Sequence, residues 1–172
     1  MKKIYLILLI LTGYFSLNTA NAQTCAPDPL AVAQGPGIYP DSATNFVSGT
    51  VGVAYNQNIT VVVPADTQLL PSPFPATPFD SIHMVSMLNL PPGLTYMCNG
   101  TSTPASLCTW LGGTIGCSAI YGTPTTAGTY TLNITVNVYV GGSTTPVPQN
   151  INYYKILINP AVGIQENAAV GF

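Results

Sequence analysis

The side chains that could take part in acid–base or nucleophilic catalysis are few and lie far apart in the sequence. The chain contains a single histidine, His83, and no serine stands in the Gly-x-Ser-x-Gly pattern that exposes a nucleophile at a sharp turn. A hydrolytic triad requires a nucleophile, a base and an orienting acid at one point. We therefore expect a non-catalytic protein, and a small hydrolase that relies on His83 is the weakest of three functional hypotheses.

The carboxylates are equally scattered along the chain. Glycoside hydrolysis needs a facing pair of carboxylates, and calcium needs several clustered oxygen ligands. Three aspartates stand beside turn residues, where an aspartate side chain has a structural role. The sequence therefore predicts neither a metal nor a cofactor. The five acids are Asp28, Asp41, Asp66, Asp80 and Glu166.

The N-terminal region has the features of a cleaved signal peptide. Two lysines precede an apolar run over residues 4–17, which is short for a membrane span. The small residues Ala20 and Ala22 then form a cleavage pattern, so that the mature chain is expected to begin at Gln23. A retained signal anchor is the alternative. We expect no membrane span in the mature chain, because no later segment is long and apolar enough.

The charge that remains after cleavage limits the possible partners. Lys155 is then the one basic residue, set against five acids. Nucleic acids and anionic membrane surfaces require clustered lysine or arginine side chains. We therefore expect the partners to be the export machinery and an extracellular polysaccharide or surface protein.

Four cysteines follow the cleavage site, and in an exported chain they predict two disulfides. Zinc is disfavoured because no C-x-x-C pair occurs and His83 stands apart. If the strands that flank residues 97–118 form a hairpin, Cys98 and Cys117 lie near its base. This geometry favours Cys98–Cys117 with Cys25–Cys108. The pairing Cys98–Cys108 with Cys25–Cys117 is an alternative of nearly equal merit.

Alternation of apolar and polar residues dominates the chain and predicts an all-β fold. The strongest pattern is strict alternation over residues 129–140, which indicates one buried and one solvated face. Residues 147–158 are expected to return as a single last strand, hairpinned to the previous one. About seven short strands separated by turns indicate a β-sandwich.

Two further strands carry explicit predictions about which side chains are buried. Residues 58–63 place Ile59, Val61 and Val63 on one face. Residues 80–90 place Ile82, Met84 and Leu88 on one face and His83, Val85 and Met87 on the other. His83 is accordingly expected to be a half-exposed strand residue.

Two turn signatures organise the chain. Residues 90–95 read Leu-Pro-Pro-Gly-Leu-Thr, and residues 120–130 read Ile-Tyr-Gly-Thr-Pro-Thr-Thr-Ala-Gly-Thr-Tyr. In this order they resemble the putative immunoglobulin-like (cadherin-like) domains of bacterial surface and secreted proteins, over roughly residues 44–158. The resemblance implies a Greek-key β-sandwich used for adhesion, spacing or carbohydrate association. The long insert at residues 97–118 departs from the simpler members.

These features predict four regions. They are a signal peptide at 1–22, an extended lead-in at 23–43, the sandwich at 44–159 and a tail at 160–172. The tail resembles the linker that precedes the C-terminal sorting domain of type IX secretion substrates in Bacteroidetes, although the sorting domain itself is missing here. Either the chain is a fragment or the likeness is accidental. We expect a secreted or cell-surface module.

Trp110 is the best candidate for a carbohydrate contact, because sugars bind exposed aromatic faces beside amides and hydroxyls. The alternative is that Trp110 caps the core near the disulfides, since tryptophan is usually largely buried. A carbohydrate-binding module that uses Trp110 is the second functional hypothesis. Outward-facing Tyr139 and either Tyr153 or Tyr154 are further aromatic candidates.

Two short motifs resemble the Asp-Ser/Thr-apolar O-glycosylation pattern of Bacteroidetes. They place candidate acceptor hydroxyls at Ser42 and Ser81. The motif is short enough to occur by chance, and Ser81 stands at the start of a predicted strand.

Overall fold

The computed structural model describes residues 25–67, 76–102, 104 and 107–161. The signal-peptide prediction, with Ala20, Ala22 and Gln23, and nearly all of the predicted tail lie outside these residues. The described residues form one helical turn, α2 (Pro29–Val32), and twelve strand segments. The strands are β1 (Gly37–Tyr39), β2 (Gly49–Thr50), β3 (Tyr55–Val62), β4 (Asp66–Thr67), β5 (Thr77–Leu88), β6 (Leu94–Asn99), β7 (Thr109–Leu111), β8 (Ile115–Gly122), β9 (Gly128–Thr131), β10 (Asn133–Val140), β11 (Val147–Ile151) and β12 (Lys155–Asn159).

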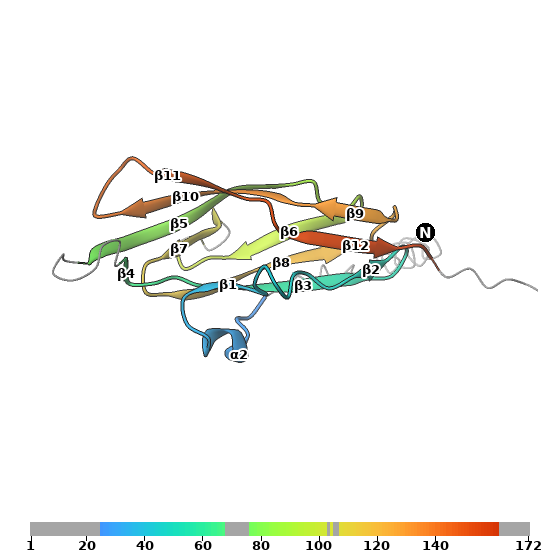
Figure 1. Cartoon of the computed structure of the whole chain (residues 1–172), viewed down its shortest axis with the longest axis horizontal. Helices are drawn as coiled ribbons and strands as arrows, with labels where there is room; N and C mark the ends of the chain where they lie inside the picture. Colours follow the sequence, from blue (N-terminus) through green and yellow to red (C-terminus); the bar gives the residue numbers. More distant parts are fainter. Residues whose placement is uncertain (1–24, 68–75, 103, 105–106, 162–172) are drawn as a thin grey trace, which may run out of the picture.

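The strands form a β-sandwich, which confirms the predicted all-β class. One layer is the antiparallel sheet β1-β3-β8-β6. The facing layer contains β11-β10-β5 with β4 and β7, and it continues along the long axis as β2-β12-β9 (Figure 1). Helical turn α2 lies outside this sandwich, below β1 and β3 in the view of Figure 1.

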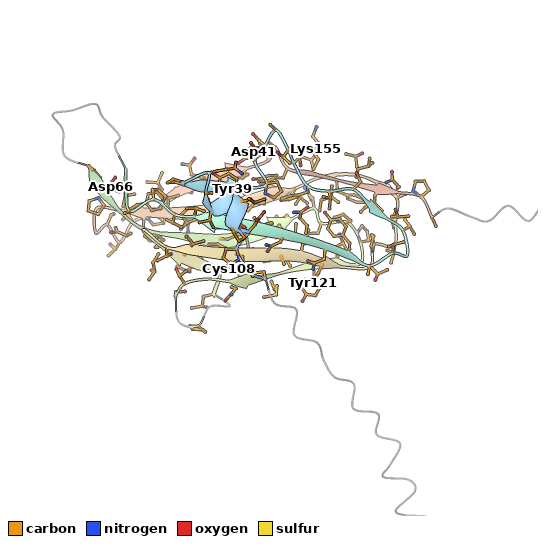
Figure 2. The ribbon with its side chains drawn as sticks, turned by 90° about the horizontal axis from the view of Figure 1, so that it is seen from below. Tyr39, Asp41, Asp66, Cys108, Tyr121 and Lys155 are labelled. Atoms are coloured by element: carbon orange, nitrogen blue, oxygen red, sulfur yellow. A yellow bond between two sulfur atoms is a disulfide. The ribbon has the colours of Figure 1, made fainter. Side chains whose placement is uncertain are left out.

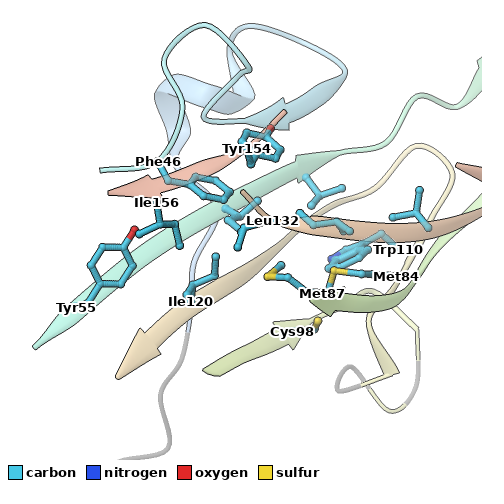
Figure 3. Close-up of a cluster of buried hydrophobic side chains, with 14 of the residues drawn as sticks. Phe46, Tyr55, Met84, Met87, Cys98, Trp110, Ile120, Leu132, Tyr154 and Ile156 are labelled. Carbon is cyan, nitrogen blue, oxygen red and sulfur yellow. The ribbon is translucent and has the colours of Figure 1, made fainter. Parts of the chain in front are cut away.

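The core fills the space between the two layers (Figure 3). The expected alternation in β3 is confirmed, because Ile59 and Val61 are buried, as is Val63 directly after the strand. Strand β8 supplies Ile120, and the facing layer supplies Leu132 and side chains from β5, β10 and β12. The layers are thus held together by apolar burial, the main favourable term in folding.

The long alternating run at residues 129–140 has the predicted burial pattern as far as Val136, whereas residues 137–140 are all half-buried, and the run forms two strands. Leu132, Ile134 and Val136 are buried as expected. The chain leaves one sheet for the other at Leu132, where the backbone N–H of Leu132 donates to the carbonyl oxygen of Tyr154 (2.9 Å). Strand β9 pairs with β12, whereas β10 pairs with β5 and β11.

The prediction of a single last strand over residues 147–158 is wrong for the same reason. The chain crosses between sheets at Tyr154, so that β11 and β12 belong to different sheets. The expected hairpin is present, because β11 pairs antiparallel with β10. Alternation reports which side is buried and carries no signal for a change of partner strand.

In β5 the expected faces are wrong beyond Met84. Both Met84 and Met87 are buried, while Val85 and Leu88 are exposed. The register with β10 pairs Ser86 with Thr135 and Met84 with Val136, leaving Val85 as an extra residue. Such a β-bulge shifts the alternation by one residue.

The two turn signatures pack against each other at the β6–β8 end of the sandwich. The backbone N–H of Thr123 donates to the carbonyl oxygen of Gly93 (3.2 Å), and that of Thr125 donates to the carbonyl oxygen of Pro92 (2.9 Å). A Cβ atom on Gly93 would lie 2.1 Å from the Thr123 carbonyl oxygen, and one on Gly122 would lie 2.3 Å from that of Gly93. Both glycines also have positive φ angles, so that glycine is required on both counts.

Candidate functional site

The cysteines form two disulfides, Cys25–Cys117 and Cys98–Cys108. The favoured pairing was therefore wrong, and the alternative is confirmed. Strands β6 and β8 do form a hairpin, but Cys98 lies opposite Ser118 in its register. Side chains of paired residues point to the same face, so Cys117, one residue away, points to the other face. Cys98 belongs to the core between the layers, and Cys117 lies on the outside of the sheet.

Residues 25–43, which we call the lead-in, cover this outer face. The Cys25–Cys117 disulfide joins the lead-in to β8. Next to Cys117 in the register, the Thr60 side-chain oxygen accepts a hydrogen bond from the backbone N–H of Asp28 (2.9 Å). The Asn58 side-chain amide donates to the carbonyl oxygen of Ala26. These three attachments bury Thr60 almost completely, although it points away from the core.

The lead-in was predicted to be extended, but it contains α2 and β1. The Asp28 side chain caps the helical turn by accepting the backbone N–H of Leu30 (2.9 Å), and Pro29 occupies the first helical position, where its missing N–H costs nothing. Strand β1 pairs antiparallel with β3, so the lead-in contributes an edge strand to the sandwich.

A polar turn follows β1 and joins the lead-in to the second layer. The Tyr154 hydroxyl donates to the carbonyl oxygen of Pro40 (2.7 Å), and burial raises the pKa of Tyr154 above its ordinary value. The Asp41 carboxylate accepts the backbone N–H of Thr44 (2.7 Å). Hydrogen bonds from Thr44 hold the pKa of Asp41 below its ordinary value, so Asp41 is negatively charged at neutral pH.

Between the lead-in and the outer face of β3 lies a solvent-accessible pocket of about 340 Å³, which we call the lead-in pocket. Figure 2 looks onto this face and shows Tyr39 beside α2, with Asp41 near the adjacent edge. The side chains that matter for its chemistry are those of Asp28, Gln34, Tyr39, Asp41, Thr44 and Asn58. Side chains from two stretches of the chain, residues 28–44 and 57–60, thus converge on one polar cavity.

The Asn58 side chain joins the wall of this pocket to the lead-in, because its amide donates to the carbonyl oxygen of Ala26. Its side-chain oxygen is buried and accepts no hydrogen bond from any residue that the structure describes. A buried acceptor without a partner costs about 1–3 kcal/mol of stability. Because this oxygen is inaccessible to solvent, it is not an acceptor for a ligand in the pocket.

Tyr39 forms another wall of the pocket. Its hydroxyl donates to the carbonyl oxygen of Gly35 (3.0 Å), and its ring is folded back over Gly37. A Cβ atom on Gly37 would lie 3.1 Å from the ring, which is tighter than ordinary van der Waals contact. Glycine at position 37 thus lets the aromatic ring occupy this position.

Trp110 is not an exposed platform, and this prediction is wrong. Its side chain is 3% exposed and lies in the core (Figure 3). The indole N–H donates to the carbonyl oxygen of Asn99 (3.3 Å), and a Cβ atom on Gly116 would lie 2.2 Å from the indole ring. Strand β7 pairs with β5 and carries Trp110 inward over Gly116, so the core-cap alternative is confirmed.

The other predicted residues lie in different places and do not meet. Ser42 is exposed in the turn capped by Asp41, whereas Ser81 is half-buried in β5 between β10 and β7. His83 is half-buried as expected, with its Nδ1 atom 2.8 Å from the Thr109 hydroxyl. Asp80 accepts the backbone N–H of Gly142 (2.7 Å). Tyr139 is half-buried, Tyr153 is exposed and Tyr154 is buried.

Within the described residues, no three of the side chains of histidine, cysteine, aspartate and glutamate are grouped so that they could hold a metal ion. No helix among these residues has the length and apolar character needed to cross a membrane. No protein-family model matches the chain, and no curated protein matches it significantly. Its function has therefore to be argued from the site itself.

Sequence reasoning missed the lead-in pocket. The signal that could have found it is the pair of polar residues Asn58 and Thr60 on the solvated side of β3. They are ordinary outward-facing residues until the lead-in is fastened over them. Choosing the Cys25–Cys117 pairing would have placed the lead-in on that face, because Cys117 and Thr60 are register partners.

Proposed function

We propose that this protein is a non-catalytic exported module that serves in adhesion, spacing or presentation at the cell surface or in the medium. The observation that carries the proposal is that the fold is fastened by two disulfides, one of which bonds the lead-in to the sandwich. Disulfides of this structural kind persist in oxidising compartments outside the cytoplasm.

The arrangement of the polar side chains supports a binding role over catalysis. Asp28, Asp41 and Asp80 each accept a backbone N–H in a cap or turn. His83 is paired with a threonine hydroxyl on the neighbouring strand. These groups serve local structure, whereas acid–base catalysis needs titratable groups that converge on one reacting atom.

The shape supports presentation. Strand β12 ends at one tip of the long axis, whereas the lead-in lies on the flank of the sandwich (Figure 1). A module held at that tip would display its flank, including the lead-in pocket. Export by the type IX route, suggested by the sequence of the tail, is part of this proposal.

Intact-mass spectrometry of the product from the culture medium and the cell surface, with and without reductant, tests the proposal. We expect a chain that begins at Gln23 and is lighter by the hydrogens that the two disulfides remove. A product that keeps Met1, carries free thiols and stays inside the cell would overturn the proposal. Extra mass beyond Phe172 would support the type IX route, and sugar increments would map to Ser42 before Ser81 because Ser42 is exposed.

A further inference from the structure

The lead-in pocket has the size of a small-molecule site. Its volume of about 340 Å³ lies at the lower end of the range typical of ligand sites, about 300–1,000 Å³. A second cavity, inside the apolar core, measures only about 40 Å³ and is lined mainly by aliphatic and aromatic side chains. The lead-in pocket is thus a better candidate than this core cavity for a polar ligand.

The walls of the lead-in pocket offer more hydrogen-bond acceptors than donors. The Asp28 carboxylate accepts the backbone N–H of Leu30, and the Asp41 carboxylate accepts hydrogen bonds from Thr44. A carboxylate has sites for about four hydrogen bonds, so both retain sites for a ligand. Gln34 lies exposed at the rim and supplies an amide that can both donate and accept.

These walls select a class of ligand. Two carboxylates repel phosphates and other anions, and none of the described residues that line the pocket is lysine or arginine. An apolar ligand would leave the carboxylates without partners. A ligand rich in hydroxyl groups donates to both carboxylates and accepts from the Gln34 amide, while its C–H face can lie against the Tyr39 ring.

We propose that the lead-in pocket binds the terminal unit of an uncharged saccharide and that the Cys25–Cys117 disulfide keeps the pocket in its binding shape. This inference gives a ligand to the exported module proposed above. It relocates carbohydrate recognition from the buried Trp110 to the surface of the lead-in.

The first test is NMR titration of the oxidised mature chain with glucose, galactose, mannose and xylose as separate probes. We expect at least one probe to give saturable shifts at the side-chain amides of Asn58 and Gln34, with a dissociation constant on the order of 1 mM. If none of the four gives saturable shifts at these amides, or if the shifts map to another face, the proposal is overturned.

Matched variants separate recognition from folding. Gln34→Ala removes an exposed side chain and is expected to weaken binding about fivefold, the value of one hydrogen bond. Tyr39→Ala removes a wall and is expected to weaken binding at least about tenfold. Gln149→Ala on β11 and Tyr121→Ala on β8 change the same residue types outside the pocket and should leave the affinity unchanged. Unchanged affinity in both pocket variants would contradict the proposal.

A cationic ligand is the competing outcome, because the pocket carries negative charge. Calcium chloride and putrescine are therefore titrated under the same conditions, and Asp28→Asn/Asp41→Asn is compared with the unmodified chain. The saccharide proposal requires sugar binding to survive in moderate salt and to exceed that of either cation. Tighter binding of a cation, abolished in the double variant, would overturn it.

The role of the disulfide is tested with two double variants. Cys25→Ala/Cys117→Ala frees the lead-in and should reduce the affinity for the sugar by at least about tenfold. Cys98→Ala/Cys108→Ala removes the disulfide on the other face and should leave the affinity unchanged once the variant is shown to be folded. Equal binding by both would contradict this part of the proposal. The mass experiment on export is independent of every result here.

Discussion

Strands β3 and β8 have two buried faces, and the two faces are covered in different ways. The inner face meets the second layer through Ile59, Val61 and Ile120, which are nearly inaccessible to solvent. The outer face is covered by the lead-in through the Cys25–Cys117 disulfide and two hydrogen bonds, to Thr60 and from Asn58. The inner face is stabilised mainly by apolar burial, whereas the outer cover is held by one covalent bond, the pairing of β1 with β3 and a few side-chain hydrogen bonds.

The difference separates the part of the sandwich that provides most of the stability from the surface at which we propose recognition. Apolar side chains packed between two layers leave no room for a ligand larger than the small core cavity. A short segment held over a polar strand face leaves a pocket of about 340 Å³ with acceptors in its walls. The Cys25–Cys117 disulfide and the pairing of β1 with β3 hold this cover in place.

The largest expected effect is the loss of the Cys25–Cys117 disulfide. This bond joins residues 92 apart, whereas Cys98–Cys108 joins residues 10 apart. The chain-entropy model gives about 4–5 kcal/mol for the long loop and about 3 kcal/mol for the short one. We therefore expect Cys25→Ala/Cys117→Ala to lower the free energy of unfolding in urea more than Cys98→Ala/Cys108→Ala.

Amide NMR spectra of the same two variants sharpen the comparison of the faces. In Cys25→Ala/Cys117→Ala, resonances of the lead-in should shift strongly while those of Ile59 and Ile120 stay close to their original positions, because the core lies on the other face. If Cys25→Ala/Cys117→Ala loses less stability than Cys98→Ala/Cys108→Ala, the interpretation that the Cys25–Cys117 disulfide holds the lead-in in place is contradicted. Global loss of the spectrum of Cys25→Ala/Cys117→Ala, under conditions where Cys98→Ala/Cys108→Ala remains folded, would also contradict it.

The next largest effect is expected on the inner face. Ile120 is 0% exposed, and Ile120→Ala leaves a cavity between the layers. Truncation of a buried isoleucine to alanine costs about 2–5 kcal/mol. We expect a loss of about 3 kcal/mol in urea unfolding. The matched control is Leu157→Ala on β12, where the side chain is exposed and the expected change is within about 0.5 kcal/mol.

A comparable loss in both aliphatic variants would show that the inner face is not the principal source of stability. Sugar titration of Ile120→Ala sharpens the comparison further. Provided that the variant is folded, its affinity at the lead-in pocket should be unchanged, because Ile120 is not among the residues that line the pocket.

The inner face was largely predictable from the sequence, because its signal is local. Alternation along one strand identified Ile59, Val61 and Val63, and the same rule identified Leu132, Ile134 and Val136. The rule failed at Val85, where an extra residue reverses the faces. It also failed at Leu132 and Tyr154, where the chain changes sheets without interrupting the alternation.

The outer face was not predictable in the same way, because its cover comes from a distant segment. Nothing in the sequence around Asn58 or Thr60 indicates that residues 25–43 lie over them. The β6–β8 hairpin, which was the condition for the favoured disulfide pairing, is present, but the turn signatures did not indicate the faces on which its cysteines lie. Cys98 pairs in register with Ser118, so Cys117, one residue away, points to the opposite face of the sheet from Cys98. This offset of one residue decides the disulfide pairing.

The smallest effect concerns the polar turn after β1, where the lead-in is held by hydrogen bonds alone. Hydrogen bonds from Thr44 keep the pKa of Asp41 below its ordinary value of 3.8 in the folded chain. A group whose folded pKa is depressed adds stability above its unfolded pKa and loses it as the pH falls through the folded pKa. The stabilising contribution of Asp41 is thus present near neutral pH and disappears below about pH 4.

Asp41→Asn keeps an oxygen for the Thr44 N–H but does not titrate, so the difference in urea midpoint between it and the original chain should shrink on acidification. Ser42→Ala, in the same exposed turn, should show no such pH dependence. A difference between Asp41→Asn and the original chain that stays constant or grows as the pH falls would mean that the carboxylate does not help to hold the turn, and the outer cover would then depend even more heavily on its disulfide.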